Sequence, residues 1–335
     1  MNEGGSRPAV LVTGGAGYIG SHAVLALIDA GWRVAVIDNL STGFEWAVAK
    51  EAAFTKGDIA DQDLVARLID EHGIGAIVHF AGSIVVPESV EKPLSYYENN
   101  MVKSRALIES AVKGGVGHFI FSSTAATYGI PERVPVTEDA RTQPINPYGW
   151  SKLMTERMLI DTAAAHPLNF CALRYFNVAG ADPKGRSGQS TAGATHLIKV
   201  AVEAAIGKRG HVSVYGTDYD TPDGTGVRDY IHVSDLAAAH VDALEKLIAE
   251  PEKSHIMNCG YGRGFSVLEV LDAVDRVTNM RIARRMEARR AGDPDALVAD
   301  NHKILATLPW RPRLDDLDTI VTHALAWERK LAGRR

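Results

Sequence analysis

The feature that most constrains the fold is a short apolar run that leads directly into spaced glycines. Residues 10–12 read Val-Leu-Val, and after Thr13 glycine stands at positions 14, 17 and 20. An apolar helical pattern follows at positions 24, 25, 27 and 28. Gly14 permits a tight turn, Gly17 lets a pyrophosphate approach a helix N-terminus, and Gly20 lets helix and strand pack closely. The pattern predicts the strand, turn and helix of a dinucleotide-binding fold.

A second apolar run, residues 34–37, ends in Asp38 and is followed by Asn39. A carboxylate at this point can accept a hydrogen bond from a ribose 2′-hydroxyl and would repel a 2′-phosphate. The sequence therefore predicts NAD rather than NADP. The alternative, a glycine-rich turn without a ligand, is disfavoured because strand, helix and acid all stand at the expected distances.

Strand-like and helix-like segments alternate over the first half of the chain. Strands are expected over 10–13, 33–38, 53–56, 76–80, 119–123 and 170–176, and helices over 18–30, 62–72, 96–113 and 147–165. This alternation predicts an α/β protein with a Rossmann-type doubly wound parallel sheet. Residues 1–177 are expected to form an NAD-binding domain, to which a later segment near 228–260 returns.

The pattern loosens after residue 177. The stretches 180–193 and 216–226 are expected to be loops, because they are rich in Gly, Ser, Thr and Asp. Helices are expected over 194–206, 234–248, 267–278 and 316–331. Residues 178–335 are therefore expected to form mainly a smaller C-terminal substrate-binding domain.

Composition excludes several classes of function. The chain has 335 residues and a formal net charge of −5, so no basic excess indicates a nucleic-acid or anionic-membrane partner. No apolar run approaches a membrane span, and residues 1–8 lack a signal-peptide core. Cys171 and Cys259 lie in apolar strand-like segments, and buried free thiols suit a cytoplasmic protein. The 12 histidines have no metal-ligand spacing, so no metal is expected.

A second motif carries residues suited to proton transfer. Residues 146–152 read Asn-Pro-Tyr-Gly-Trp-Ser-Lys, which places Tyr148 and Lys152 on one face of a helix, one turn apart. Asn146 is a good N-cap and Pro147 a good first helical residue. The Lys ammonium and the positive helix end favour the phenolate, so we expect the pKa of Tyr148 to fall. Such a pair can move a proton on and off a hydroxyl, although the spacing alone also fits a surface helix.

The fifth expected strand ends in Ser122, Ser123 and Thr124. Ligands of doubly wound sheets bind beyond the carboxyl ends of the strands, so the Thr124 hydroxyl is the best placed to face Tyr148. A hydroxyl, a Tyr and a Lys beside a nicotinamide would make a hydride-transfer site. The alternative, that residues 122–124 only cap the strand end, remains open at this point.

Together these motifs resemble the extended short-chain dehydrogenase/reductase family, and within it the UDP-glucose 4-epimerases. The likeness covers nearly the whole chain. It rests on residues 13–22, 38–40, 56–58, 79–82, 88–90, 99–100, 146–152, 173–177, 227–233 and 289–293. It implies an NAD-dependent isomerase that interconverts UDP-glucose and UDP-galactose by C4 oxidation, rotation of the 4-keto sugar and re-reduction.

The resemblance also implies roles for individual residues. Tyr148 would be the base, Lys152 would hold the cofactor ribose and tune Tyr148, and Thr124 would relay the proton. Cofactor contacts are expected from Gly14, Gly17, Tyr18, Ile19, Gly20, Asp38, Asn39, Asp58, Ile59, Phe80, Ala81, Asn99, Ser122, Tyr148, Lys152 and Tyr175, with Asp58 and Ile59 flanking the adenine. UDP-sugar contacts are expected from Thr124, Asn177, His196, Leu197, Tyr215, Arg228, Arg290, Asp293 and Leu297.

Within the second set, Asn177, Arg228 and Arg290 would hold the UDP, Tyr215 would pack on the uracil and Asp293 would meet its ribose. The chain departs from the commonest family pattern at four positions. Thr124 stands where Ser is usual, Ile84 where Lys is found, and His196 where Asn is frequent, and Leu297 replaces another residue of the sugar pocket. Ile84 would remove a cofactor-phosphate contact, His196 would make a charge pH-dependent, and Leu197 should pack rather than bind.

Several alternatives remain open. A dehydratase or decarboxylase of this family needs an acidic group beside the strand-five hydroxyl, where this chain has Ala125 and Ala126. A 4-epimerase of another UDP-sugar (UDP-xylose or UDP-arabinose, UDP-glucuronate, or UDP-GlcNAc) fits the same motifs. A non-catalytic NAD-bound scaffold is disfavoured by the intact Tyr148 and Lys152. The resemblance further suggests a homodimer through the helices near 96–113 and 147–165.

Overall fold

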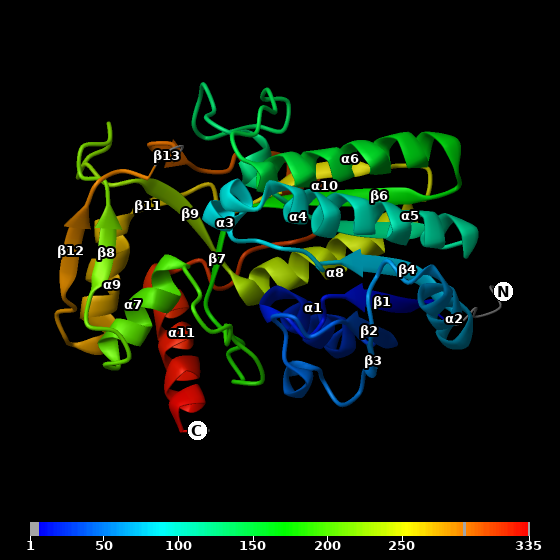
Figure 1. Ribbon diagram of the computed structural model, residues 1–335, viewed down its shortest axis with the longest axis horizontal. Coiled ribbons are helices and arrows are strands. Elements are labelled where there is room, and N and C mark those ends of the chain that lie inside the picture. Colours follow the sequence, from blue (N-terminus) through cyan, green and yellow to red (C-terminus); the bar gives the residue numbers. More distant parts are fainter. Residues whose placement is uncertain (1–6, 291–292, 334–335) are drawn as a thin grey trace. The chain divides into compact units, whose positions relative to one another are not determined.

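The computed structural model describes residues 7–290 and 293–333 (Figure 1). The chain divides into two compact units. Unit 1 comprises residues 1–123, 151–173 and 237–256, and unit 2 comprises residues 124–150, 174–236 and 257–335. Among the described residues, none of the helices has both the length and the apolar character needed to span a bilayer.

Unit 1 is built on a seven-stranded sheet with the order β10-β6-β5-β4-β1-β2-β3. The strands are β1 (Ala9–Thr13), β2 (Val34–Asp38), β3 (Ala53–Lys56), β4 (Ile74–His79), β5 (His118–Thr124), β6 (Asn169–Tyr175) and β10 (His255–Cys259). β1 lies between β2 and β4 and is parallel to both, and the chain adds β2 and β3 on one side of β1 and β4, β5 and β6 on the other. The predicted doubly wound sheet is confirmed, and ligands of such sheets bind at the switch point, which here lies between β1 and β4.

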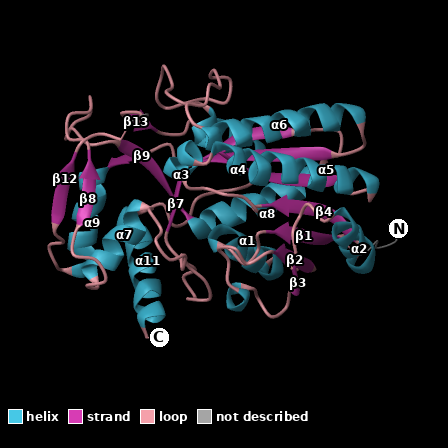
Figure 2. Ribbon diagram, viewed as in Figure 1, coloured by secondary structure: helices cyan, strands magenta, loops and turns pink. Residues whose placement is uncertain are grey.

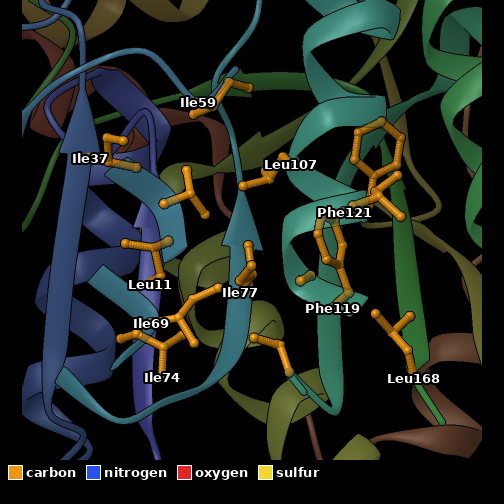
Figure 3. Close-up of a cluster of buried hydrophobic side chains, with 14 of the residues drawn as sticks. Leu11, Ile37, Ile59, Ile69, Ile74, Ile77, Leu107, Phe119, Phe121 and Leu168 are labelled. Atoms are coloured by element: carbon orange, nitrogen blue, oxygen red, sulfur yellow. The ribbon is translucent and has the colours of Figure 1, made fainter. Parts of the chain in front are cut away.

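Helices cover both faces of this sheet because side chains alternate along each strand. On one face, Leu11, Ile37 and Ile77 pack in one cluster with residues of α2 (Gln62–His72), α5 (Lys103–Lys113) and α6 (Pro147–Ala165), as Figure 3 shows for Leu107 of α5. On the other face, α1 (Tyr18–Asp29) contacts β1 and β2. Helix α8 (Val233–Ala249) brings His240 to within 4.8 Å of the Phe80 ring, just beyond β4. The two cysteines, in β6 and β10, are buried and are not joined in a disulfide, as expected.

Residues 96–113 are helical, as expected, but they do not form one regular α-helix. The structure has α4 (Pro93–Tyr97), a π-helical turn (Glu98–Val102) and then α5, and a short helix α3 (Val86–Glu91) precedes them. The Asn100 carbonyl in the π turn accepts the hydroxyls of Ser104 at 2.7 Å and Thr155 at 3.2 Å. The Asn100 carbonyl in the wider π turn thus binds hydroxyl groups from both α5 and α6. Such π turns are frequent at functional sites.

Unit 2 contains shorter strands, joined by long loops (Figure 2). β7 (Asn177–Ala179), β9 (Val227–His232), β11 (Gly264–Ser266) and β13 (Ala296–Leu297) form one sheet, and β8 (Val212–Tyr215) pairs in parallel with β12 (Arg284–Glu287). The helices are α7 (Leu197–Ala205), α9 (Val267–Thr278), α10 (His302–Thr307) and α11 (Leu317–Ala332). α7, α9 and α11 pack around a second apolar core that includes Val202, Leu271 and Val321. The sequence pattern predicts none of these short strands.

Candidate active site

The turn after β1 has the shape of a phosphate cradle. Gly14 has a φ of +70°, and a Cβ there would lie 2.7 Å from the Ala81 amide nitrogen. A Cβ at Gly20 would lie 2.1 Å from the Gly14 carbonyl oxygen, so both positions exclude a side chain. Gly17 is the N-cap of α1, and no side chain of the described residues caps this end. The N–H groups of the first turn, which begins with Tyr18 and Ile19, are therefore suited to an anion such as a pyrophosphate.

Asp38 ends β2 beside this turn and is held by the backbone. One carboxylate oxygen accepts the Ala16 N–H at 3.0 Å, and the other accepts the Leu40 N–H at 2.8 Å. Each oxygen retains capacity for a further hydrogen bond, since a carboxylate can accept about four. The buried Asp38 thus fits the expected ribose contact, with Asn39 next to it. The residues of this edge fit NAD.

Asp58 and Ile59 follow β3, and their side chains have different surroundings. Asp58 accepts hydrogen bonds from the Ala60 N–H at 2.9 Å and from the Lys103 ammonium. Burial alone would raise the pKa of Asp58, but the bonds from Lys103 and Ala60 outweigh it and the pKa falls below its ordinary value. The Ile59 side chain is part of the apolar core (Figure 3).

A buried polar chain joins the turn after β1 to the end of β4. His79 lies 2.7 Å from the Thr13 hydroxyl through Nδ1 and 2.8 Å from the Ser104 hydroxyl through Nε2. Ser104 already donates to the Asn100 carbonyl, so Nε2 of His79 carries the proton and Nδ1 accepts from Thr13. Burial, with a smaller effect from the charge of Lys152, lowers the pKa of His79 to about 3, so the ring stays neutral.

The π turn orders the next loop. The Asn100 side chain accepts from the Ser83 N–H at 2.7 Å and donates to the Ser83 carbonyl at 2.9 Å. Its neighbour Asn99, an expected cofactor residue, donates to the Ser83 hydroxyl at 2.9 Å. His79 and Asn100 belong to the motifs that carry the resemblance, but no role was predicted for either. Both side chains hold loops at the carboxyl ends of β1 and β4 through hydrogen bonds to residues that are distant in the chain.

Lys152 lies at the carboxyl end of β5. Its Nζ donates to the Ser122 carbonyl at 3.0 Å and lies 5.0 Å from the centre of the Phe121 ring. Burial lowers the pKa of Lys152 to about 8, which keeps the ammonium mostly charged at neutral pH. An ammonium has three N–H donors, so Lys152 can bind a neighbouring ligand as well as the Ser122 carbonyl.

Tyr148 and Thr124 are brought together by the start of α6. The helix begins as predicted: the Asn146 side chain accepts the Gly149 N–H at 2.9 Å. Gly149 allows a close approach, because a Cβ there would lie 2.6 Å from the Ala126 carbonyl oxygen. A side-chain hydrogen bond joins Thr124 to the buried Tyr148. The expected pairing of these two hydroxyl groups is present.

The expected fall in the pKa of Tyr148 is wrong for this structure. Burial raises the pKa of Tyr148, and the hydrogen bond with Thr124 only partly opposes this effect. The phenolate loses its hydration in a buried site, and this cost exceeds the favourable influences that the sequence indicated. Tyr148 and Lys152 do lie one turn apart on α6, as expected.

Three of the expected UDP-sugar residues lie on the four-stranded sheet of unit 2. Arg228 of β9 lies opposite Leu297 of β13 and Phe265 of β11 in the strand register. Asn177 begins β7, which runs parallel to β9 and pairs with it at Tyr230. Arg228 donates to its neighbouring carbonyl, that of Val227, at 2.8 Å. Asn177, Arg228 and Leu297 therefore come from three strands of one sheet.

Tyr215 ends β8, and the Arg290 guanidinium lies 3.7 Å from the centre of its ring. Asp293 follows, with its N–H bonded to the Arg290 carbonyl at 3.4 Å. Ala291 and Gly292 of the same motif lie outside the described residues. Next to this pair, Arg289 stacks on Tyr219 at 4.1 Å, a contact for which the sequence pattern gave no role.

The remaining expected residues lie in different surroundings. His196 precedes α7, its Nδ1 is buried without a partner among the described residues, and burial lowers its pKa. Leu197 packs against the apolar core, as predicted. Leu297 packs against Ala125 and Tyr128. Tyr175 is the last residue of β6 and belongs to unit 2.

The fold and this combination of residues are those of an NAD-dependent enzyme that acts on a nucleotide sugar, and comparisons with known proteins agree. The model of the NAD dependent epimerase/dehydratase family matches residues 10–260, so the chain belongs to this family. It is 55% identical over 326 residues to a UDP-glucose 4-epimerase of Azospirillum brasilense, with 97% of this chain and 93% of the relative covered.

Solved structures give the same result. A UDP-glucose 4-epimerase of Stenotrophomonas maltophila, with bound NAD and formylated UDP-arabinopyranose, has a TM-score of 0.95 and 39% identity over 98% of this chain and 100% of that chain. A UDP-glucose 4-epimerase of Brucella ovis in complex with NAD has a TM-score of 0.92 and 45% identity over 95% of this chain and 98% of that chain.

Proposed function

We propose that this chain interconverts UDP-glucose and UDP-galactose by inverting the configuration at C4 of the sugar, with NAD as a recycled cofactor. The observation that carries the proposal is the hydrogen bond between Thr124, which ends β5, and the buried Tyr148, which lies on the same helix as Lys152. Family membership and the similarity to UDP-glucose 4-epimerases support it.

The cofactor would be held by the glycine turn, by Asp38 and by Lys152, and NAD supplies the acceptor, and later the donor, of the C4 hydride. Tyr148 removes the proton from the sugar 4-hydroxyl, and Thr124 relays it. Because burial raises the pKa of Tyr148, the phenolate needs a nearby positive charge, and the Lys152 ammonium one helical turn away is the group suited to provide it. After the 4-keto sugar has turned, the hydride would return to the opposite face of C4 while Tyr148 gives the proton back to the 4-oxygen, which completes the inversion.

Epimerisation needs a firm grip on the nucleotide and a loose one on the sugar. Arg228 and Arg290 can each bind phosphate oxygens with a planar pair of N–H donors. Tyr215, with 37% of its surface exposed, offers a ring face for the uracil. These contacts would keep the diphosphate fixed while the 4-keto sugar turns about its bond to it.

The alternative reactions of the family are less well supported. The turn that follows Thr124 begins with Ala125 and Ala126, which cannot donate or accept the proton that dehydration requires. The choice among UDP-sugars rests on Leu297, which packs beside this turn, and we propose hexoses without an N-acetyl group as the preferred substrates.

We also infer a cytoplasmic homodimer that forms through the helices of residues 93–113 and through α6. Apolar side chains on these helices support the proposed interface: Leu94 is 80% exposed, and Val102, Met154 and Ile160 are each 39% exposed. Sedimentation analysis should give twice the mass of 36.1 kDa. Replacement of Leu94 and Met154 by Glu should give the monomer.

The decisive experiment uses the purified protein without added cofactor. Given UDP-galactose, it should form UDP-glucose, detected by chromatography, and it should release bound NAD on denaturation. It should not reduce a pool of free NAD, because the hydride returns within each turnover. Stoichiometric accumulation of NADH would identify a dehydrogenase, and a failure to convert any UDP-sugar would favour the scaffold alternative.

A further inference from the structure

Arg289 makes a different set of contacts from its neighbour Arg290. Its Nε donates to the Asp218 carboxylate at 2.7 Å, and a terminal N–H donates to the Asp218 carbonyl. Another terminal nitrogen lies 3.7 Å from the Asp295 carboxylate. The guanidinium also covers the Tyr219 ring at 4.1 Å. Arg289 thus joins three segments: the end of β12, the loop after β8 and the approach to β13.

The Tyr219 ring, on which Arg289 stacks, packs against the backbone directly after β8. Tyr219 is 5% exposed. It lies against Gly216, where φ is +83° and a Cβ would be 2.4 Å from the Tyr219 ring. Gly216 directly follows Tyr215, and its N–H donates to the Glu287 carbonyl at 2.9 Å. Tyr219 therefore packs against the residue that directly follows Tyr215 in the chain.

Two consecutive arginines consequently stack on two tyrosines of one loop. Arg290 lies on Tyr215 at 3.7 Å, and Arg289 lies on Tyr219 at 4.1 Å. Tyr215 and Arg290 are partly exposed and take part in the proposed nucleotide site, whereas the second pair is anchored by the Asp218 ion pair. The anchored pair can hold the exposed pair in one arrangement, because both pairs share the same two backbone segments.

Charge around the anchored pair is also balanced by Arg289. After the larger effect of burial, the carboxylates of Asp293 and Asp295 raise the pKa of the Tyr219 phenol, while Arg228 and Arg289 lower it. Without Arg289, the carboxylates of Asp218 and Asp295 would lose their cation beside the arginines proposed to bind a diphosphate. Carboxylates without their cation repel an anionic ligand, and this repulsion weakens its binding.

We infer that Arg289 is a positioning residue for the nucleotide: it fixes the Tyr215–Arg290 pair and neutralises the adjacent carboxylates without touching the substrate. This inference rests on the proposed function, since it takes that pair to bind a nucleoside diphosphate. In this arrangement the exposed pair, Tyr215 and Arg290, contacts the UDP, and the anchored pair, Arg289 and Tyr219, orients the exposed pair.

The test compares Arg289→Met with Arg276→Met. Arg276 is a matched control, because its Nε donates to the Asp318 carboxylate at 2.9 Å in an exposed bidentate pair. For Arg289→Met we expect the KM for UDP-galactose and the inhibition constant of UDP to rise about 10-fold, equivalent to ~1.4 kcal/mol. The kcat and the content of bound NAD should stay at wild-type values. Arg276→Met should change none of these quantities.

A double-mutant cycle separates positioning from a general structural role. Arg290→Met alone should raise the KM about 100-fold, because it removes a charged contact to the ligand. If Arg289 acts through Arg290, adding Arg289→Met in that background should raise the KM by less than about 3-fold, since residues that act together are not additive. Asp218→Asn, which breaks the anchor without leaving an unpaired carboxylate, should have a smaller effect than Arg289→Met.

Three results would overturn the inference: an unchanged KM in Arg289→Met, an equal loss of kcat and bound NAD, or the full effect retained in the Arg290→Met background. If Arg289→Met does not fold, Asp218→Asn provides the same readouts. Binding of UDP to the wild-type protein is measured first by calorimetry. Its absence would refute the proposed function itself, whereas normal wild-type binding with an unaffected Arg289→Met would refute only the role of Arg289.

Discussion

The two units present their proposed ligands with different kinds of groups. Unit 1 offers mainly backbone: the glycine turn, the N-terminus of α1, and Asp38 fixed by two backbone N–H groups. Unit 2 offers long side chains on short strands and loops, such as Tyr215 and Arg290, which are held by stacking. A site defined by backbone tolerates little change in shape. A site defined by partly exposed charged side chains can bind and release a ligand at each turnover.

The comparison matches the needs of the proposed reaction. A recycled cofactor must stay bound through many turnovers, so a rigid cradle is appropriate. The UDP-sugar must leave after each turnover, and the sugar must turn while bound. We therefore expect substitutions in unit 1 to act on NAD retention, and substitutions in unit 2 to act on the KM or on the choice of sugar, with the proton-transfer residues as the exception.

The largest effect is expected at Tyr148, one of the proton-transfer residues. Tyr148→Phe removes the proton acceptor and keeps the ring, so the kcat should fall by about 10² to 10⁴-fold, the usual contribution of general acid–base catalysis. The content of bound NAD and the affinity for UDP should change little. Rapid assays of UDP-galactose conversion, with NAD quantified after denaturation, give both readouts. A variant with near wild-type turnover would contradict the assignment of Tyr148 as the base.

Next in size is a change of substrate range within unit 2. Leu297 packs beside Ala125 and Tyr128 and is expected to limit space at the sugar. Overpacking costs about 1–3 kcal/mol, so UDP-GlcNAc should be a poor substrate of the wild-type protein, and Leu297→Ser should raise its relative kcat/KM by roughly 5- to 150-fold. NAD retention should not change.

Leu297→Met is the control for this substitution, since it conserves volume and should leave the ratio of activities unchanged. Kinetics on UDP-glucose and UDP-GlcNAc check both variants. If the wild-type protein already converts the two sugars equally well, Leu297 does not limit sugar size.

The unit 1 cradle is tested by Gly20→Ala. The added Cβ would lie 2.1 Å from the Gly14 carbonyl oxygen, so the turn or the helix must move. Such overpacking costs about 1–3 kcal/mol, and we expect the content of bound NAD to fall about 10-fold. Gly117→Ala is the matched control, because a Cβ there meets no described atom within 4 Å. Equal NAD content in both variants would show that the cradle is not rigid.

The same contrast explains what could be predicted from the sequence. Some signals are local: the helices at 62–72 and 147–165 begin and end at the expected residues, and the side chains of Asp61 and Asn146 cap their N-termini. The pairing of Tyr148 with Thr124 could be predicted as well, since strand ends in a doubly wound sheet define where ligands bind.

Other features depend on residues that are distant in the chain. β13 has two residues and pairs with β9, so no periodicity could reveal it. The π turn coincides with hydrogen bonds from the hydroxyl groups of Ser104 and Thr155 to the Asn100 carbonyl. The stack of Arg289 on Tyr219 joins residues that are 70 positions apart in the chain, from 219 to 289. The direction of the pKa shift of Tyr148 cannot be predicted from the sequence for a similar reason, because burial is a property of the tertiary structure and outweighs the local charges.

The smallest expected effect is a change with pH that involves Lys152. Burial lowers the pKa of this ammonium to about 8, so the charged form is present at neutral pH and is lost as the pH rises through that value. With its loss the Tyr148 phenolate is less stabilised, and the kcat should fall about 4-fold between pH 7 and pH 8.5, in proportion to the charged fraction. Lys152→Arg keeps the charge at every pH measured and should abolish this alkaline limb, even if its kcat is lower. A pH–rate profile of both proteins provides the test. An unchanged limb in Lys152→Arg would show that another group titrates, and would separate the tuning of Tyr148 from the charge on Lys152.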